Sequence, residues 1–250
     1  MLGSETKIKD VLKGLNQSLL RNINYRFQLY GKEKIIKKNI EKYKRLLQSS
    51  EIIDCDSYIS MHDKPSEILK AKENSSMFLA IKSVKEKFAD AVLSFGNTGA
   101  LMSLSLLNIK TLKNIKRPAI ASIWPNLNGE SIVLDLGANT KLDTRYLIDN
   151  SILGSSLASV LFKIDNPSIG LLNVGVEDNK GKDEIRRASD TLKNLSKNSK
   201  INYYGYVEGS DISVGRTNVV VTDGFTGNIS LKTAEGTAKL FQSHLNDAFR

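Results

Sequence analysis

Two short segments of this chain share the pattern Gly-x-Thr-Gly, which can hold an anion without a charged side chain. The first contains Gly96, Asn97, Thr98 and Gly99, and the second contains Gly224, Thr226 and Gly227. An apolar run that predicts a strand precedes each copy, and a run with helical spacing follows it. Glycine allows close approach of the main chain, and N–H groups at a helix N-terminus point toward an anion. One copy alone would be ordinary turn and cap chemistry, but two in matching contexts predict a two-sided anion site.

Further polar side chains follow other predicted strands. Three segments supply them, at residues 134–139, 172–181 and 207–209. Neither Gly-x-Thr-Gly copy is a Walker A motif or a G-x-G-x-x-G motif. Ligands of parallel α/β sheets bind at the carboxyl ends of the strands. The candidate residues near these ends, with one from the start of the last helix, are Asp135, Asn139, Asn173, Glu177, Lys180, Glu208 and Asn228.

The residue types favour a reaction in which phosphate itself is the nucleophile. The chain has no G-x-S-x-G motif, and its single cysteine, Cys55, has no paired motif, so covalent catalysis has no obvious agent. Attack of phosphate on an acyl group needs positioning, a cation and donors for the oxyanion. We expect Lys180 to supply the cation and Asn228 a donor. The alternatives are a solvated loop lysine and a helix-capping amide.

The elements expected to carry these residues alternate along the chain. Apolar spacing predicts helices over residues 5–20, 35–47, 66–72, 75–87, 100–107, 143–162, 182–196 and 229–245, strands over 23–29, 51–55, 89–95, 169–174, 201–207 and 219–222, and a hairpin from 118–124 and 131–136. This alternation predicts an α/β fold whose mostly parallel sheet is covered by helices on both faces.

Composition excludes several classes of protein. Among 250 residues, 40% are hydrophobic and 25% charged, as in ordinary globular proteins. No apolar stretch approaches membrane-spanning length, and the first ten residues show no signal-peptide core. One cysteine and two histidines, His62 and His244, exclude a disulfide framework, a zinc finger and a histidine-rich metal site. We expect a cytoplasmic protein without a metal.

The net charge of +9 is unevenly distributed. Residues 1–50 contain twelve lysines and arginines against four acidic residues, which accounts for +8. One interpretation is a basic face for an acidic partner or a membrane surface. The interpretation we favour is a solvated helix face in a sequence rich in lysine, asparagine and isoleucine. Nucleic acid is disfavoured because no recognition motif accompanies the charge.

Several segments together resemble the bacterial phosphate acyltransferases of phospholipid synthesis, the acyl-acyl-carrier-protein:phosphate transacylases. The resemblance runs from about residue 3 to the C-terminus. The segments that carry it are Ala89–Met102 (ADAVLSFGNTGALM), Arg117–Ala119, Leu134–Asn139 (LDLGAN), Gly170–Gly175 (GLLNVG) with Lys180 and Gly181, and Asp223–Asn228 (DGFTGN) with Leu231–Thr233 and Glu235–Gly236.

The resemblance implies a fold, a reaction and partners. The fold is two-lobed, of the isocitrate-dehydrogenase and phosphotransacetylase kind, with lobes expected at residues 1–140 and 141–250. The reaction moves a long acyl chain from acyl carrier protein to inorganic phosphate and gives acyl phosphate. A cytoplasmic homodimer is implied, peripheral to the membrane, with no organic cofactor and with contact to a downstream glycerol-3-phosphate acyltransferase. Gly96–Gly99, Lys180 and Asn228 would line a site between the lobes.

This sequence departs from the family pattern in places. The family begins with a strand and an A-M-G-G-D loop, and ends with a G-G-A…L-L-G segment and a late H-G-x-S. We expect this chain to lack both parts. Lys70 and Asn74 stand where the family prefers arginine and aspartate. The alternatives are an inactive remnant that keeps dimerisation or acyl-carrier-protein binding, and a short-chain phosphotransacetylase that uses a coenzyme A thioester.

Overall fold

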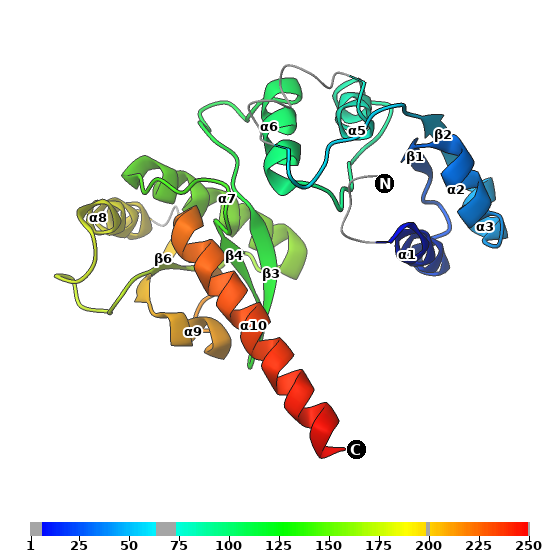
Figure 1. The fold of residues 1–250 in the computed structure, drawn as a ribbon. Helices are drawn as coiled ribbons and strands as arrows, with labels where there is room; N and C mark the ends of the chain where they lie inside the picture. Colours follow the sequence, from blue (N-terminus) through cyan, green and yellow to red (C-terminus); the bar gives the residue numbers. More distant parts are fainter. Residues whose placement is uncertain (1–6, 64–73, 199–200, 250) are drawn as a thin grey trace. The chain divides into compact units, whose positions relative to one another are not determined.

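The computed structural model describes residues 7–63, 74–198 and 201–249 (Figure 1). The chain divides into two compact units, unit 1 from Met1 to Lys113 and unit 2 from Asn114 to Arg250. The predicted helix at residues 66–72 lies outside the described residues.

Unit 1 contains two parallel strands and five described helices. Val11, Leu12 and Leu19 of the first helix are buried at helical spacing, and Leu12 and Leu19 pack in a core with side chains of the strands and of the next two helices. The predicted helix over residues 35–47 is two helices, because the chain turns at residues 41–43. The elements are α1 (Ile8–Arg21), β1 (Phe27–Gly31), α2 (Glu33–Ile40), α3 (Lys44–Gln48), β2 (Ser50–Asp54), α5 (Ser76–Lys85) and α6 (Thr98–Asn108).

The predicted strand at Ala89–Phe95 is wrong for this structure. Its side chains do alternate between exposed and half-buried positions from Ala91 to Phe95, as in a strand. A strand also needs a hydrogen-bonded neighbour. No strand in the described part of the chain pairs with this backbone, so the segment is irregular.

Unit 2 is built on a five-stranded sheet in the order β3-β4-β7-β5-β6. The first strand is antiparallel to the second, which confirms the predicted hairpin, and the remaining pairs are parallel. The elements are β3 (Ala121–Asn126), β4 (Gly129–Leu134), α7 (Thr144–Phe162), β5 (Ser168–Leu172), α8 (Asp183–Lys197), β6 (Asn202–Val207), α9 (Gly209–Val214), β7 (Val219–Val221) and α10 (Gly224–Ala248). The short helix α9 was not predicted.

Both faces of this sheet are covered, as the sequence predicts for a buried parallel sheet. On one face Ile132, Leu171 and Val219 belong to a core that includes side chains of α7 and α8. On the other face Val133, Leu172 and Val220 pack with side chains of α9 and α10. The mixed α/β fold of the sequence analysis is confirmed.

The units divide at a different place from the predicted lobes. The lobes expected from the sequence meet at residue 140, whereas the units divide between Lys113 and Asn114. The difference arises because β4 pairs with β7, which draws the hairpin β3–β4 into the sheet of unit 2.

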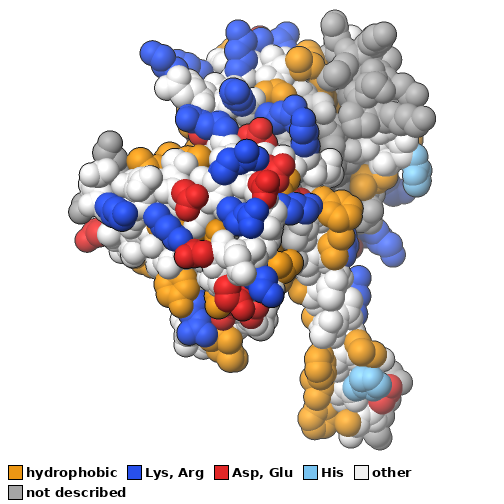
Figure 2. Space-filling model, turned by 90° about the vertical axis from the view of Figure 1, so that its left-hand side faces the viewer, with side chains coloured by type: hydrophobic (Ala, Val, Ile, Leu, Met, Phe, Trp, Pro, Cys, Tyr) orange, Lys and Arg blue, Asp and Glu red, His pale blue; other side chains and the backbone are white. Residues whose placement is uncertain are grey.

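The second half of α10 has little packing within its unit. Every residue from Glu235 to Phe249 is exposed, including the apolar side chains of Leu240, Phe241 and Leu245. Figure 2 shows hydrophobic side chains on the surface of this helix. In the part of the chain that the structure describes, no helix has both the length and the apolar character for crossing a bilayer.

Candidate functional site

The candidate residues of unit 2 emerge from one edge of the sheet. Strands β4, β7 and β5 are parallel neighbours, so their carboxyl ends lie side by side. Neighbouring strands are about 4.8 Å apart. The loops after them, at residues 135–139, 222–223 and 173–182, therefore start within a few strand spacings of one another. This edge is where α/β sheets bind ligands.

Asp135 organises the loop after β4. Its side chain is fully buried, and its oxygens accept hydrogen bonds from the main-chain N–H groups of residues 137, 138 and 139 at 3.1, 2.8 and 2.8 Å. The Tyr146 hydroxyl and the Ile120 N–H donate to it as well, at 2.7 and 3.1 Å. A buried carboxylate is tolerated when donors surround it in this way. Asp135 was predicted to bind substrate, and the structure encloses it within the protein.

Asn139 continues the same network. Its Nδ2 donates to the Pro118 carbonyl at 2.8 Å and to the Tyr146 hydroxyl at 2.6 Å, while Arg117 donates to its Oδ1 at 3.4 Å. Burial, together with the neighbouring Asp135 carboxylate, raises the pKa of Tyr146 above its usual value. The hydroxyl therefore stays protonated and keeps donating to the carboxylate.

The loop after β4 is packed against the start of α10. The Gly224 N–H donates to the Asn139 carbonyl at 2.8 Å. A Cβ at Gly227 would lie 1.9 Å from the Asp135 carbonyl oxygen, so only glycine fits. The Asn228 side chain lies beside Gly137, about 3.7 Å from where a Cβ there would stand. The structure thus brings the two predicted motifs LDLGAN and DGFTGN together.

The N-terminus of α10 is capped from within the chain. Asp223 accepts from the N–H groups of Phe225 and Thr226 at 3.0 Å each, and from the Thr226 hydroxyl at 2.7 Å. The Gly227 N–H donates to the Asp223 carbonyl at 2.9 Å. The second Gly-x-Thr-Gly is therefore the first turn of a helix rather than a loop before one. Its N–H groups already have acceptors, and its glycines serve close packing.

The first Gly-x-Thr-Gly, in unit 1, is arranged differently. Helix α6 begins at Thr98, and the Asn97 side chain caps it by accepting from the Ala100 N–H at 3.0 Å. The same amide donates to three carbonyls between residues 60 and 63, at 3.1 to 3.3 Å. Among the described residues no acceptor meets the N–H groups of Thr98 and Gly99. These two groups are the ones that remain available to an anion.

Lys180 and Asn228 are exposed in unit 2, as are three other predicted residues, Glu177, Glu208 and Thr226. Neither the Lys180 nor the Asn228 side chain has a partner among the residues that the structure describes, and both come from the ligand-binding edge of the sheet. Asn173, by contrast, is buried, and its amide bonds to main-chain carbonyls of its own loop.

Sequence reasoning missed two contributors to this edge. Asp223 is the N-cap of α10, and an aspartate directly before a helical run could have identified it. Tyr146 lies in the first turn of α7, and nothing in the sequence distinguishes it from an ordinary core residue. Only the fold shows that its hydroxyl reaches Asp135.

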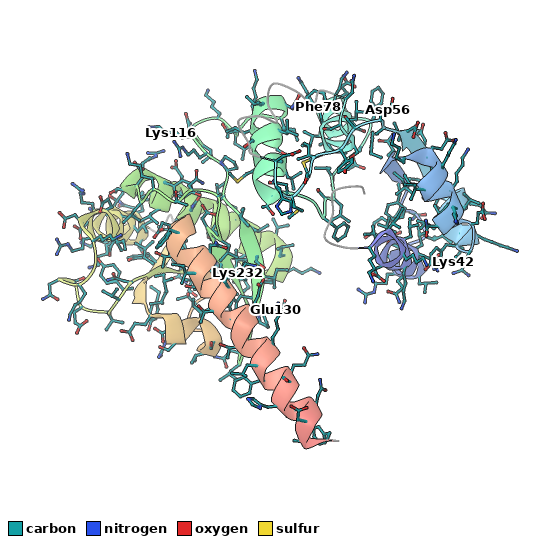
Figure 3. All side chains as sticks on the ribbon, viewed as in Figure 1. Lys42, Asp56, Phe78, Lys116, Glu130 and Lys232 are labelled. Atoms are coloured by element: carbon teal, nitrogen blue, oxygen red, sulfur yellow. The ribbon has the colours of Figure 1, made fainter. Side chains whose placement is uncertain are left out.

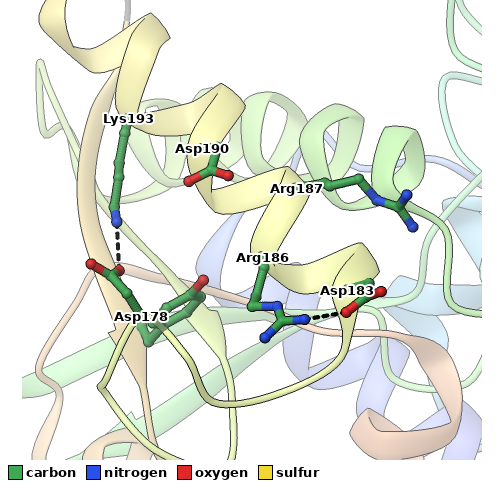
Figure 4. Close-up of a pocket in the computed structure, with 7 residues that line it drawn as sticks. Asp178, Asp183, Arg186, Arg187, Asp190 and Lys193 are labelled. Atoms are coloured by element: carbon green, nitrogen blue, oxygen red, sulfur yellow. Dashed lines mark hydrogen bonds and ion pairs between the residues drawn. The ribbon is translucent and has the colours of Figure 1, made fainter.

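A separate hollow of about 370 Å³ lies against α8 (Figure 4). Lys193 pairs with Asp178 at 2.6 Å, and Arg186 pairs with Asp183. The bond to Asp178 raises the pKa of Lys193. Figure 2 shows basic and acidic side chains intermixed on this face. Because three acidic residues offset three basic ones, the hollow has no excess charge for phosphate. Its lining residues are Asp178, Asp183, Arg186, Arg187, Asp190, Lys193 and Tyr206.

Comparison with solved structures agrees with the fold. A phosphotransacetylase, EutD from Staphylococcus aureus, matches 94% of this chain and 88% of its own, with a TM-score of 0.59 and 14% identity. A branched-chain phosphotransacylase from Enterococcus faecalis matches 83% of each chain, with a TM-score of 0.55 and 16% identity. At such identities the likeness shows the two-lobed phosphotransacetylase-like fold.

Sequence comparison is more specific. A protein from Xanthobacter autotrophicus named phosphate acyltransferase is 46% identical over 248 residues, which is 99% of this chain and 69% of that protein. One of the same name from Azorhizobium caulinodans is also 46% identical and is covered to 70%. The model of the family described as "Fatty acid synthesis protein" matches residues 1–250. The chain therefore belongs to this fatty acid synthesis protein family, together with relatives named phosphate acyltransferase.

Proposed function

We propose that this chain is an acyltransferase that moves a fatty acyl group from a thioester donor to inorganic phosphate, giving acyl phosphate for phospholipid synthesis. The observation that carries the proposal is the 46% identity, over nearly the whole chain, to proteins named phosphate acyltransferase. The chemistry of the sheet edge in unit 2 agrees with it, because that edge presents an exposed lysine and an exposed amide.

The reaction needs no nucleophile from the protein. A phosphate oxygen attacks the thioester carbonyl carbon and forms a new C–O bond. The carbonyl oxygen carries negative charge in the tetrahedral intermediate. The C–S bond then breaks, and the thiolate leaves with the carrier and takes a proton from solvent. Phosphate and the carbonyl must be held together, and both negative charges must be offset.

Each part of this chemistry has a candidate group. Lys180 offsets the charge of phosphate, and the Asn228 amide donates to the developing oxyanion. In unit 1, the N–H groups of Thr98 and Gly99, with the Thr98 hydroxyl as a further donor, are our candidates for binding an anion. In this proposal Asp135, Asn139, Gly224, Thr226 and Gly227, predicted as substrate-binding residues, hold Asn228 in place.

We propose acyl carrier protein as the donor, because its acidic surface complements the basic helices of unit 1. Between residues 7 and 50 there are twelve basic and three acidic residues. Two of the basic ones form described ion pairs, Lys32 with Asp56 and Lys37 with Glu33. Lys42, in the turn between α2 and α3, lies over the Tyr43 ring at 4.9 Å (Figure 3). Most of the others extend from α1, α2 and α3 without an acidic partner in the described chain.

We also propose that the protein works as a homodimer in peripheral contact with the membrane. A dimer would give the exposed apolar side chains of α10 a surface against which to become buried. The second half of α10 has little tertiary packing in the described structure, and a helical segment without such packing is only marginally stable in water. Burial against a partner would therefore stabilise it.

A short-chain phosphotransacetylase is the second candidate, and the two solved neighbours favour it weakly through their shared fold. The two functions differ in the acyl donor that the enzyme uses. Phosphate-dependent loss of the thioester should be measured with palmitoyl-acyl carrier protein and with acetyl-coenzyme A. We expect turnover with the first only. Turnover with acetyl-coenzyme A alone would favour the second candidate. No turnover, with acyl carrier protein still captured in a pull-down, would indicate an inactive remnant.

A further inference from the structure

The loop between β5 and α8 is folded onto one buried amide, that of Asn173. Only 8% of this residue is exposed. Its Nδ2 donates to the Gly175 carbonyl at 3.0 Å and to the Lys180 carbonyl at 3.2 Å. Its main-chain N–H donates to the Val207 carbonyl at 2.9 Å, which anchors it to the end of β6. One rigidly held amide therefore bonds to both ends of the loop.

Gly181 fits against the same amide. Its φ of +83° is a conformation that favours glycine, and a Cβ there would lie 2.0 Å from Asn173 Oδ1. The Lys180 N–H donates to the Glu177 carbonyl at 3.0 Å. Both main-chain polar groups of Lys180 are therefore fixed, while its side chain is exposed and has no partner among the described residues.

The amide of Asn173 has nothing left to offer a substrate. An asparagine Nδ2 carries two hydrogens, and two carbonyls already accept from this one. Its Oδ1 is buried and has no hydrogen-bond partner in the described structure. A residue that binds phosphate directly would need a donor that solvent can reach.

We infer that Asn173 is a positioning residue, which holds the main chain of Lys180 so that the ammonium group is presented at the ligand-binding edge of the sheet. The inference rests on the proposed function, in which Lys180 offsets the charge of phosphate. A lysine has a long flexible stem, so fixing its base limits the positions that the ammonium group samples.

The test compares single and double variants in phosphate-dependent turnover of palmitoyl-acyl carrier protein. Asn173→Ala removes both bonds to the loop, and Gly181→Ala displaces the amide independently. Asn179→Ala is the matched control, because Asn179 is an exposed asparagine of the same loop whose side chain has no partner in the described structure. Each substitution is also made in a Lys180→Ala background, and circular dichroism with thermal unfolding checks each fold.

If Asn173 acts through Lys180, Asn173→Ala and Gly181→Ala lower kcat/KM for phosphate by about tenfold or more in the wild-type background. In the Lys180→Ala background they change it by less than about twofold. Asn179→Ala has no effect in either.

Two results would overturn the inference while leaving the proposed function intact. One is wild-type turnover in folded Asn173→Ala or Gly181→Ala when Lys180→Ala is impaired. The other is a full additional loss in the Lys180→Ala background, which would show that Asn173 acts elsewhere. Normal turnover of Lys180→Ala itself would instead contradict the role that the proposed function gives to Lys180.

Discussion

Gly227 of α10 lies directly against the main-chain carbonyl of Asp135, so close that a Cβ would stand 1.9 Å from its oxygen. The contact joins the loop after β4 to the helix that carries Asn228. We expect Gly227→Ala to lower the free energy of unfolding by about 3 kcal/mol, because main chain cannot easily move away from the new methyl group. Urea denaturation of purified protein measures this.

The control for that prediction lies on the same helix. A Cβ at Gly236 would meet nothing within 4 Å. Gly236→Ala should raise the free energy of unfolding by about 0.5–1 kcal/mol through helix propensity alone. Equal effects of the two substitutions would contradict the packing of α10 on the β4 loop.

The Tyr146–Asp135 pair predicts a loss of stability in alkali. The pKa of Tyr146 is raised by burial and by the neighbouring carboxylate, from an ordinary value of 10.0. Above pH 10 the unfolded chain releases this proton while the folded protein keeps it, so stability falls as pH rises. The loss should approach about 1.4 kcal/mol per pH unit for this tyrosine.

Urea denaturation between pH 8 and 11 tests that slope. Tyr203, whose pKa is also raised, mainly by burial, contributes in the same direction. Tyr146→Phe should therefore flatten the dependence without abolishing it. Tyr204→Phe, at an exposed tyrosine, should leave it unchanged. An identical slope for wild type and Tyr146→Phe would argue against the buried pair.

The basic face of unit 1 predicts a donor-specific effect. Lys9, Lys13 and Arg21 lie on one side of α1 at helical spacing and have no described partner. Reversing all three to glutamate should raise KM for palmitoyl-acyl carrier protein by about tenfold at low salt, with little change in kcat.

Turnover of a small acyl thioester should be unaffected by the same change. A matched charge reversal in unit 2, at the exposed residues Lys163, Lys197 and Lys239, should change KM for the carrier far less. If both triple variants behave alike, the effect is one of net charge, and α1 is not the docking surface.

Sequence patterns predicted much of the fold, because local periodicity and turn chemistry determine element type. Helix α7, expected at residues 143–162, is observed at Thr144–Phe162, and the hairpin β3–β4 is present. The strand prediction at Ala89–Phe95 was wrong because alternating exposure indicates an extended segment but does not specify a neighbouring strand for it to pair with. Likewise, the pairing of β4 with β7 is a long-range contact that no local pattern specifies.

The candidate site was also only partly predictable from the sequence. Residue type and strand-end position led to the prediction of Lys180 and Asn228, and both side chains are exposed in the structure. The same reasoning could not tell an exposed amide from a buried one, so it grouped Asn173 and Asn139 with substrate-binding residues. It also treated the two Gly-x-Thr-Gly copies as equivalent. They differ because Asp223 caps α10 from outside its copy, whereas Asn97 caps α6 from inside its own.

The most direct test of the account is phosphate-dependent formation of acyl phosphate from palmitoyl-acyl carrier protein by the purified protein and its variants. Wild type should form acyl phosphate, and Lys180→Ala and Asn228→Ala should each lose about a hundredfold or more of this activity, with folding intact. Lys182→Ala, at an exposed lysine of the same loop, should keep wild-type activity. Near-normal turnover in both Lys180→Ala and Asn228→Ala would contradict the account.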